Sequence, residues 1–273
     1  MRPPLAYHGG KARLAHVIAG LLPPHRVYCE PFAGSLAVLF AKRPANIEMV
    51  NDLDSDLVNF WRQLRDRGPQ LVDLLAMTPY ARDEYHGAWQ PTDDPLEQAR
   101  RFWVRVQQGF AHKTGTRSGW QCSASDGRAS TPKSATVLRK VAGLPETIDR
   151  LAPVLIDSRP AIDVIAMMDG PRTVHYCDPP YVQSSQSSRS GGAYRHTMTE
   201  DDHRGLADTL RACEGTVVLS GYPSPLYDAL YGDWHRTQLP GRADTANRSR
   251  TTNERTEVLW SNRPLPAPDL TLF

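Results

Sequence analysis

The 273-residue sequence predicts an α/β fold built on a mostly parallel sheet, and three observations carry this prediction. Short apolar runs at 27–30 and 47–50 have the length and composition of strands. A turn and a helical pattern follow each of them, which gives the order of a βαβ unit with parallel strands. Further strand signals at 154–156, 173–177, 217–220 and 257–261 continue the same sheet.

The first 65 residues supply the elements of that unit in order. Residues 11–22 have the spacing of a short amphipathic helix. Small residues at 31–35 predict a tight turn after the first strand, and a helix is expected to begin within 36–41. After the second strand, Asp54 or Ser55 can cap a helix whose apolar positions are Val58, Trp61 and Leu64.

The middle of the chain departs from this rhythm. Apolar helical stretches occur at 71–77 and 100–108, and a basic stretch rich in Gly, Ser and Thr at 114–134 predicts a loop or a β-ribbon. We therefore expect residues 63–149 to form an inserted, smaller, mainly helical domain. Residues 1–62 and 150–273 would form the domain that contains the sheet.

The remaining residues predict two polar loops and one well-capped helix. Residues 184–192 are rich in Ser and Gly, and 240–256 are polar and basic, so both are expected to be loops. Thr199 is expected to cap a helix at 200–212, because acidic residues occupy its first turn.

The net charge of +2 conceals charged blocks along the chain. Residues 44–99 carry eleven acidic and four basic residues, whereas 100–150 carry ten basic and three acidic ones. Aromatic residues are interleaved with this basic block, which is typical of a nucleic-acid surface. A solvated protein face is the alternative interpretation.

Several classes of protein are disfavoured. The four cysteines are far apart and form no Cys-x-x-Cys pair, so reduced thiols are expected rather than a disulfide framework or a zinc ribbon. The apolar run at 14–22 contains His16 and ends at Pro23 and Pro24, so it is too short to cross a membrane. The first residues also lack the apolar core of a secretory signal.

The most specific motif is Asp178-Pro179-Pro180-Tyr181, which directly follows an apolar strand. Parallel sheets bind ligands at the carboxyl ends of their strands. Two prolines make the turn stiff and remove two backbone donors, so the motif presents a carboxylate, carbonyl oxygens and an aromatic ring. This set suits a planar group with an amino substituent, such as adenine. A plain Asp-Pro turn is the alternative.

A small-residue turn and an acid suggest a second part of the site. Ala33, Gly34 and Ser35 allow the backbone to approach a bound nucleoside or amino acid. The turn lacks the three-glycine dinucleotide pattern, which favours another adenosyl ligand over NAD. Asp52 ends the next strand, where an acid can accept hydrogen bonds from ribose hydroxyls. Its alternative role is helix capping, for which Asp54 and Ser55 are better placed.

The N-terminal motif runs from Tyr7 through Gly9 and Gly10 to Lys11. Paired glycines between an aromatic residue and a lysine suggest a loop folded over an anion or a carboxylate. A flexible N-terminal turn is the alternative.

Taken in order, these motifs resemble the Dam-type DNA adenine amino-methyltransferases. The resemblance rests on Tyr7-x-Gly-Gly-Lys11, Pro31-Phe-Ala-Gly34, Asn51-Asp52 and Asp178-Pro-Pro-Tyr181, with further likeness at 194–203 and 254–262. It covers about residues 5–60 and 150–262. It implies a class I methyltransferase (Rossmann-like) sheet with helices on both faces, and S-adenosylmethionine as the methyl donor.

By motif position, the resemblance also assigns roles to individual residues. The cofactor would contact Tyr7, Lys11, Pro31, Phe32, Gly34, Asp52 and Asp178. The catalytic residues would be Asp178, Pro179, Pro180 and Tyr181, which would hold an adenine flipped out of the duplex. No metal is required. The segment 63–149 would be the target-recognition domain.

Double-stranded DNA is the expected partner. We expect the protein to be a monomer in the cytoplasm, encoded by a bacterium or a phage. Base or phosphate contacts are expected from arginines in the middle and late basic segments: Arg117, Arg128, Arg242, Arg248, Arg250 and Arg255. Restriction–modification is one role for such an enzyme. Methylation of cytosine N4 or RNA, or a DNA-binding relative without catalysis, are the alternatives.

Overall fold

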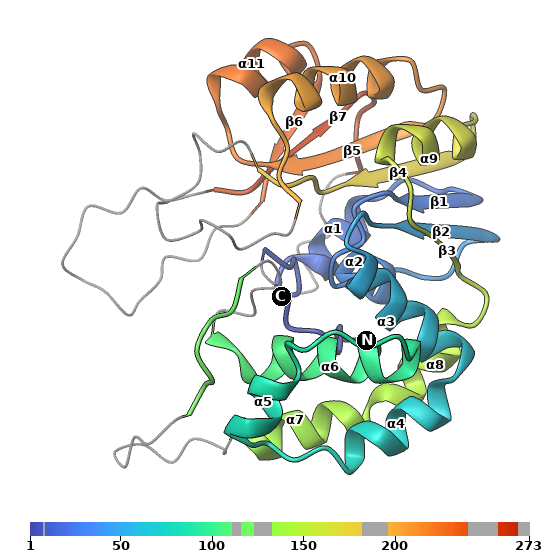
Figure 1. The fold of residues 1–273 in the computed structure, drawn as a ribbon. Helices are drawn as coiled ribbons and strands as arrows, with labels where there is room; N and C mark the ends of the chain where they lie inside the picture. The colour runs from blue at the N-terminus through green and yellow to red at the C-terminus, as the bar shows by residue number, and fades with distance from the viewer. Residues whose placement is uncertain (8, 111–115, 123–132, 182–195, 240–255, 267–273) are drawn as a thin grey trace.

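The computed structural model describes residues 1–7, 9–110, 116–122, 133–181, 196–239 and 256–266. Within this part of the chain lies a seven-stranded sheet of order β3-β2-β1-β4-β5-β7-β6 (Figure 1). Strands β1 to β5 run parallel, and β7 is antiparallel to both β5 and β6. The strands are β1 (Val27–Glu30), β2 (Ile47–Asn51), β3 (Leu155–Asp157), β4 (Thr173–Cys177), β5 (Thr216–Gly221), β6 (His235–Gln238) and β7 (Val258–Ser261).

Helices cover both faces of the sheet, as expected for this fold class. Alternate strand residues face opposite layers: Tyr28 and Val50 belong to the largest apolar cluster, whereas Cys29 and Met49 pack against Val164 of α9. One face packs against α1 (Ala15–Leu21), α2 (Ala37–Ala41) and α3 (Ser55–Asp66). The other packs against α9 (Ala161–Met168), α10 (Glu200–Arg211) and α11 (Pro225–Tyr231).

The middle segment is helical and shares its core with the sheet. It contains α4 (Gly68–Ala76), α5 (Arg82–Gly87), α6 (Pro95–Gln108), α7 (Lys133–Ala142) and α8 (Leu144–Leu151), which lie together beside α3 (Figure 1). The Phe60 ring of α3 stacks on Trp103 of α6, with centroids 5.8 Å apart. Leu71 and Leu144 belong to the same apolar cluster as Val50 of β2. The division into two domains stays a prediction.

Most elements that the sequence predicts are present, with small shifts at their ends. The strand at 27–30 has the expected bounds. The first helix begins at Ala15 rather than at residue 11, because the preceding residues form a turn in which Leu14 donates to the Lys11 carbonyl. Asp54 caps α3, and Thr199 caps α10 through a capping box with Asp202.

Several helices and one strand were not predicted from the sequence, and both predicted polar loops lie largely outside the described residues. The sequence reasoning missed α5, α7, α8, α9, α11 and β6. Residues 184–192 and nearly all of 240–256 lie outside the described residues. Of residues 114–134, for which the sequence predicts a loop or a β-ribbon, the structure describes only 116–122 and 133–134. Trp120 forms an isolated antiparallel bridge with Gly109, and α7 begins at Lys133. None of the described helices is both long and apolar enough to cross a membrane.

A buried ionic cluster ties α8 to the sheet. The Glu48 carboxylate of β2 accepts hydrogen bonds from Lys42 at 2.5 Å and from Arg150 of α8 at 2.5 Å. The side chains of Glu48 and Lys42 are each 3% exposed. Burial alone would raise the pKa of Glu48, but the bonds from Arg150 and Lys42 hold this pKa below its usual value. The cluster therefore stabilises the fold with Glu48 ionised.

We expect Glu48→Ala to destabilise the protein by about 3–5 kcal/mol, because it leaves two cations without their carboxylate in a buried place. Urea unfolding followed by circular dichroism measures the loss. The contribution of Glu48 should also disappear as the pH falls through the range in which carboxylates become protonated. Glu146→Ala, at an exposed position on α8, is the control and should change stability by less than about 0.5 kcal/mol. Equal effects of both substitutions would contradict a stabilising role of the cluster.

Candidate functional site

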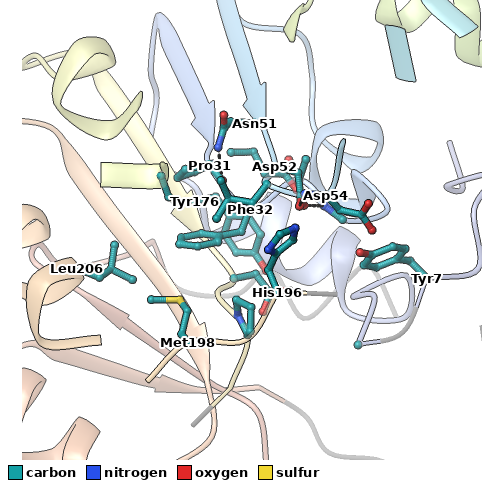
Figure 2. A pocket seen from close by; sticks show the side chains of 18 of the residues that line it. Tyr7, Pro31, Phe32, Asn51, Asp52, Asp54, Tyr176, His196, Met198 and Leu206 are labelled. Atoms are coloured by element: carbon teal, nitrogen blue, oxygen red, sulfur yellow. Dashed lines mark hydrogen bonds between the residues drawn. The ribbon is translucent and has the colours of Figure 1, made fainter. Parts of the chain in front are cut away.

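A cavity of about 430 Å³ opens at the carboxyl ends of β1, β2 and β4. This is the edge where parallel α/β sheets bind ligands. Its volume lies within the usual range for small-molecule sites. Its wall combines apolar side chains, among them Phe32, Met198 and Leu206, with several carboxylates. Figure 2 shows Leu206 and Met198 on one side of Phe32 and His196, and Asp52, Asp54 and Tyr7 on the other.

The turn after β1 is fixed by the acid that follows β2. The Gly34 amide donates to Asp52 Oδ2 at 3.0 Å, and the Asp54 amide donates to Asp52 Oδ1 at 2.9 Å. Gly34 has a φ of +46°, a left-handed conformation that favours glycine. The Trp61 indole of α3 donates to the Gly34 carbonyl and anchors the turn to the core. The Asp52 carboxylate therefore holds this turn in place through hydrogen bonds to backbone amides.

The N-terminal motif folds over the same turn. The Gly10 amide donates to the Tyr7 carbonyl at 3.1 Å. A Cβ at Gly10 would lie 3.0 Å from that carbonyl oxygen and 3.1 Å from Ser35 Oγ, so glycine allows the N-terminal loop to pack closely against the Ser35 side chain. A Cβ at Gly34 would lie 3.5 Å from the Tyr7 ring. The loop at 7–11 is therefore one wall of the cavity.

Lys11 binds the carboxylate at the end of β4. Its Nζ lies 2.7 Å from both Oδ1 and Oδ2 of Asp178 and 2.5 Å from the Tyr181 hydroxyl. Lys11 is 7% exposed. The sequence predicts that the N-terminal loop folds over an anion or a carboxylate. This contact agrees with that prediction, and the carboxylate is Asp178 of the Asp-Pro-Pro-Tyr motif.

A second buried carboxylate completes the cluster. The Tyr181 hydroxyl donates to Glu257 Oε1 at 2.8 Å, and the Ser220 hydroxyl donates to the same oxygen at 2.7 Å. The Lys11 Nζ lies 3.6 Å from this atom. The Tyr222 ring packs on Tyr181 with centroids 4.6 Å apart. One ammonium group thus lies between two carboxylates beside two phenol rings.

Burial raises the pKa values of three carboxyl groups around the cavity. The pKa of Asp178 rises to about 6; Lys11 opposes this rise and Glu257 adds to it. The pKa of Asp52 also rises to about 6, although the amides of Asp54 and Gly34 oppose the change. Burial raises the pKa of Glu30, at the end of β1, to about 8. Burial therefore disfavours the ionised forms of these carboxyl groups, and a cationic ligand in the cavity would stabilise them.

The structure brings together every residue for which the sequence predicts cofactor contact. The cavity is lined by Tyr7, Lys11, Pro31, Phe32, Gly34, Asp52 and Asp178, and Pro180 also borders it. Pro179 is buried and does not line the cavity, and Tyr181 contacts Lys11, one of the lining residues. These positions are consistent with one binding site, while the individual roles stay predictions.

The predicted DNA-binding arginines are less completely placed. Arg117 is exposed and forms a hydrogen bond with the His86 ring of α5. Arg128, Arg242, Arg248, Arg250 and Arg255 lie outside the described residues.

Sequence reasoning missed several residues of the site, above all Glu257, Ser220 and Tyr222. Glu257 immediately precedes β7, which is antiparallel to β5 with Gly221 opposite Val258. The beginning of β7 therefore lies beside the end of β5, at the same edge as Asp178. In the sequence, Glu257 is the first residue of the strand predicted at 257–261. Its place in the site depends on the antiparallel pairing of β7 with β5, which a βαβ pattern does not predict.

Comparison with known proteins agrees with this geometry. Residues 7–240 match the family model of D12 class N6 adenine-specific DNA methyltransferases, which spans most of the chain. The chain is also 25% identical over 277 residues to the type II methyltransferase M1.LlaDCHI of Lactococcus lactis subsp. cremoris, covering 96% of this chain and 95% of the relative. Both the cavity at the sheet edge and the sequence match agree with an enzyme that transfers a methyl group to DNA. The chain belongs to the D12 class of N6 adenine-specific DNA methyltransferases.

Proposed function

We propose that the cavity binds S-adenosylmethionine and that the Asp178–Tyr181 turn holds the adenine that receives its methyl group. The observation that carries this proposal is the position of Asp178. Its carboxylate borders the cavity and also belongs to the cluster with Lys11 and Tyr181. A group bound to this carboxylate would therefore lie beside a ligand in the cavity.

The lining of the cavity supports S-adenosylmethionine, a cation with an adenosyl and an amino-acid part. The ligand supplies an activated methyl group. Asp52, held by two backbone amides, is suited to accept hydrogen bonds from ribose hydroxyls. Phe32 and Pro31 offer apolar surface to a planar base. A sulfonium or ammonium group beside Glu30 would lower its raised pKa and so favour its ionised form.

The adenine amino group would be held by acceptors in the stiff turn. Asp178 and the carbonyl of Pro179 or Pro180 would accept its two N–H bonds, which orients the nitrogen lone pair toward the methyl group. The Asp178 carboxylate would also stabilise the positive charge that develops on this nitrogen. Because an adenine within a duplex is out of reach, the base would be flipped out. Tyr181 would then stack on its ring.

We also propose that residues 63–149 recognise double-stranded DNA and that the basic segments contact its phosphates. The exposed position of Arg117 and the charge of the 100–150 block support this role. The relative from Lactococcus is a type II methyltransferase, which favours a role in restriction–modification. A DNA substrate is in keeping with a cytoplasmic enzyme.

We expect Asp178→Ala and Tyr181→Ala to lower methyl transfer at least about 100-fold while the fold survives, because each removes a group that holds the reacting base. Transfer of tritium-labelled methyl groups to DNA from a host without DNA methylation measures the rate. Asp163→Ala, at an exposed position on α9, is the control and should retain full activity. Full transfer by Asp178→Ala would overturn the proposal.

We expect kcat/KM to fall as the pH drops through about 6, because Asp178 must be ionised to accept a hydrogen bond and its pKa is raised to about 6. Asp52 titrates in the same range, so calorimetric titration with S-adenosylmethionine at each pH separates loss of cofactor binding from loss of transfer. A flat profile down to pH 4.5 would contradict the role of Asp178.

We expect replacement of Arg242 and Arg248 by Gln to weaken DNA binding and to reduce the slope of log K against log salt by about 2, since each phosphate contact contributes about 0.9. Fluorescence anisotropy with a labelled duplex at several salt concentrations measures both quantities. Binding of S-adenosylmethionine should not change. An unchanged slope would remove these two residues from the interface.

A further inference from the structure

Glu257 has no assigned role, yet it contacts two residues of the proposed catalytic cluster. It is 7% exposed and accepts hydrogen bonds from the Tyr181 and Ser220 hydroxyls through one oxygen. It also lies 3.6 Å from the Lys11 ammonium. A carboxylate buried in this way is costly unless it is paired with a cation and donors, which here belong to the site itself.

The position of Lys11 creates a difficulty for methyl transfer. In this structure its ammonium lies 2.7 Å from both oxygens of Asp178, the carboxylate that should accept the adenine amino group. A positive charge in that place opposes the positive charge that develops on the nitrogen of adenine. With Lys11 and Asp178 alone, the two charges would cancel, and Asp178 would offer little to the transition state.

Glu257 resolves this difficulty through its charge and its distance. The cluster contains one ammonium and two carboxylates, so it carries one net negative charge when both acids are ionised. Lys11 Nζ needs to move only from 3.6 Å to ordinary hydrogen-bond range, near 2.9 Å, to pair with Glu257. The Tyr181 hydroxyl accepts a hydrogen bond from Lys11 and donates to Glu257 at 2.8 Å, whereas Asp178 Oδ1 is farther away at 3.4 Å. The hydroxyl can therefore stay bonded to Glu257 during this shift.

We propose that Glu257 is a positioning residue for adenine methylation: it holds the Tyr181 hydroxyl and receives the Lys11 ammonium when the adenine amino group takes its place at Asp178. This inference rests on the proposed function of Asp178 and Tyr181. Glu257 touches neither the base nor the cofactor in this scheme. It acts by leaving Asp178 with its negative charge and by fixing the ring on which the base stacks.

Glu257→Gln tests the proposal because its amide oxygen can accept both hydroxyl bonds while the negative charge is lost. We expect a fall in kcat of about 10- to 100-fold with an unchanged affinity for S-adenosylmethionine. We also expect the acid limb of kcat/KM to move to lower pH, because the charge of Glu257 contributes to the raised pKa of Asp178. Labelled methyl transfer to unmethylated genomic DNA and calorimetry provide these readouts.

Two further variants separate positioning from structure. Ser220→Ala disturbs the surroundings of Glu257 but keeps its charge, so the acid limb should stay in place. Glu214→Gln, at an exposed site before β5, should behave as the wild type in every readout. A Glu257→Gln enzyme with wild-type kcat, or with an unmoved acid limb, overturns the role of Glu257.

Failure of the proposed function would look different. In that case the wild type would bind no S-adenosylmethionine, or Asp178→Ala would transfer methyl groups normally. If Glu257→Gln does not fold, as judged by circular dichroism and cofactor binding, Tyr181→Phe removes the hydrogen bond from the other side. We expect this variant to keep its affinity for S-adenosylmethionine and to lose turnover about tenfold or more. Wild-type turnover by Tyr181→Phe likewise overturns the proposal.

Discussion

The ion pair between Lys11 and Asp178 is the contact on which the geometry of the site depends. It joins residues that are 167 positions apart in the sequence and draws the N-terminal loop across the end of β4. The loop can pack there because Gly10 leaves room for Ser35, while Gly34 lies against Tyr7. This charge pair thus links the N-terminal side of the cavity lining to the Asp-Pro-Pro-Tyr turn. Under the proposed function, the same pair places a cation where the substrate would bind, so the site would need a second acceptor for that cation.

The fold and the central residues of the site were largely predictable from the sequence because local signals agreed with the tertiary structure. Strands β1 and β4 are short apolar runs that end in turns with a distinctive composition, and both faces of the sheet are buried. Acids at the ends of such strands must meet at one edge. This reasoning placed Asp52 and Asp178 in one pocket, and the cavity contains both.

Features that depend on long-range pairing were not predictable in the same way. The helix α9 is largely apolar and short, so its periodicity was ambiguous. The strand β6 is polar and mostly exposed at the edge of the sheet, so its sequence lacks the alternation of apolar and polar residues that usually indicates a strand. The position of Glu257 in the site follows from the antiparallel register between β5 and β7, because that pairing places it at the sheet edge where Asp178 lies. Local patterns contain no information about that register.

The continuous core between the sheet and α4–α8 has a consequence for how the specificity of such an enzyme can change. Phe60, Trp103 and Leu144 belong to one apolar cluster, so α3 and the helices α4–α8 share interior contacts. Replacing α4–α8 by the corresponding helices of a relative would change Trp103 but not its partner Phe60. Such a graft would therefore require matched substitutions in α3. If residues 63–149 recognise DNA as proposed, new target preferences would arise through changes in exposed loops, while the helices that carry those loops keep a constant orientation toward the cavity.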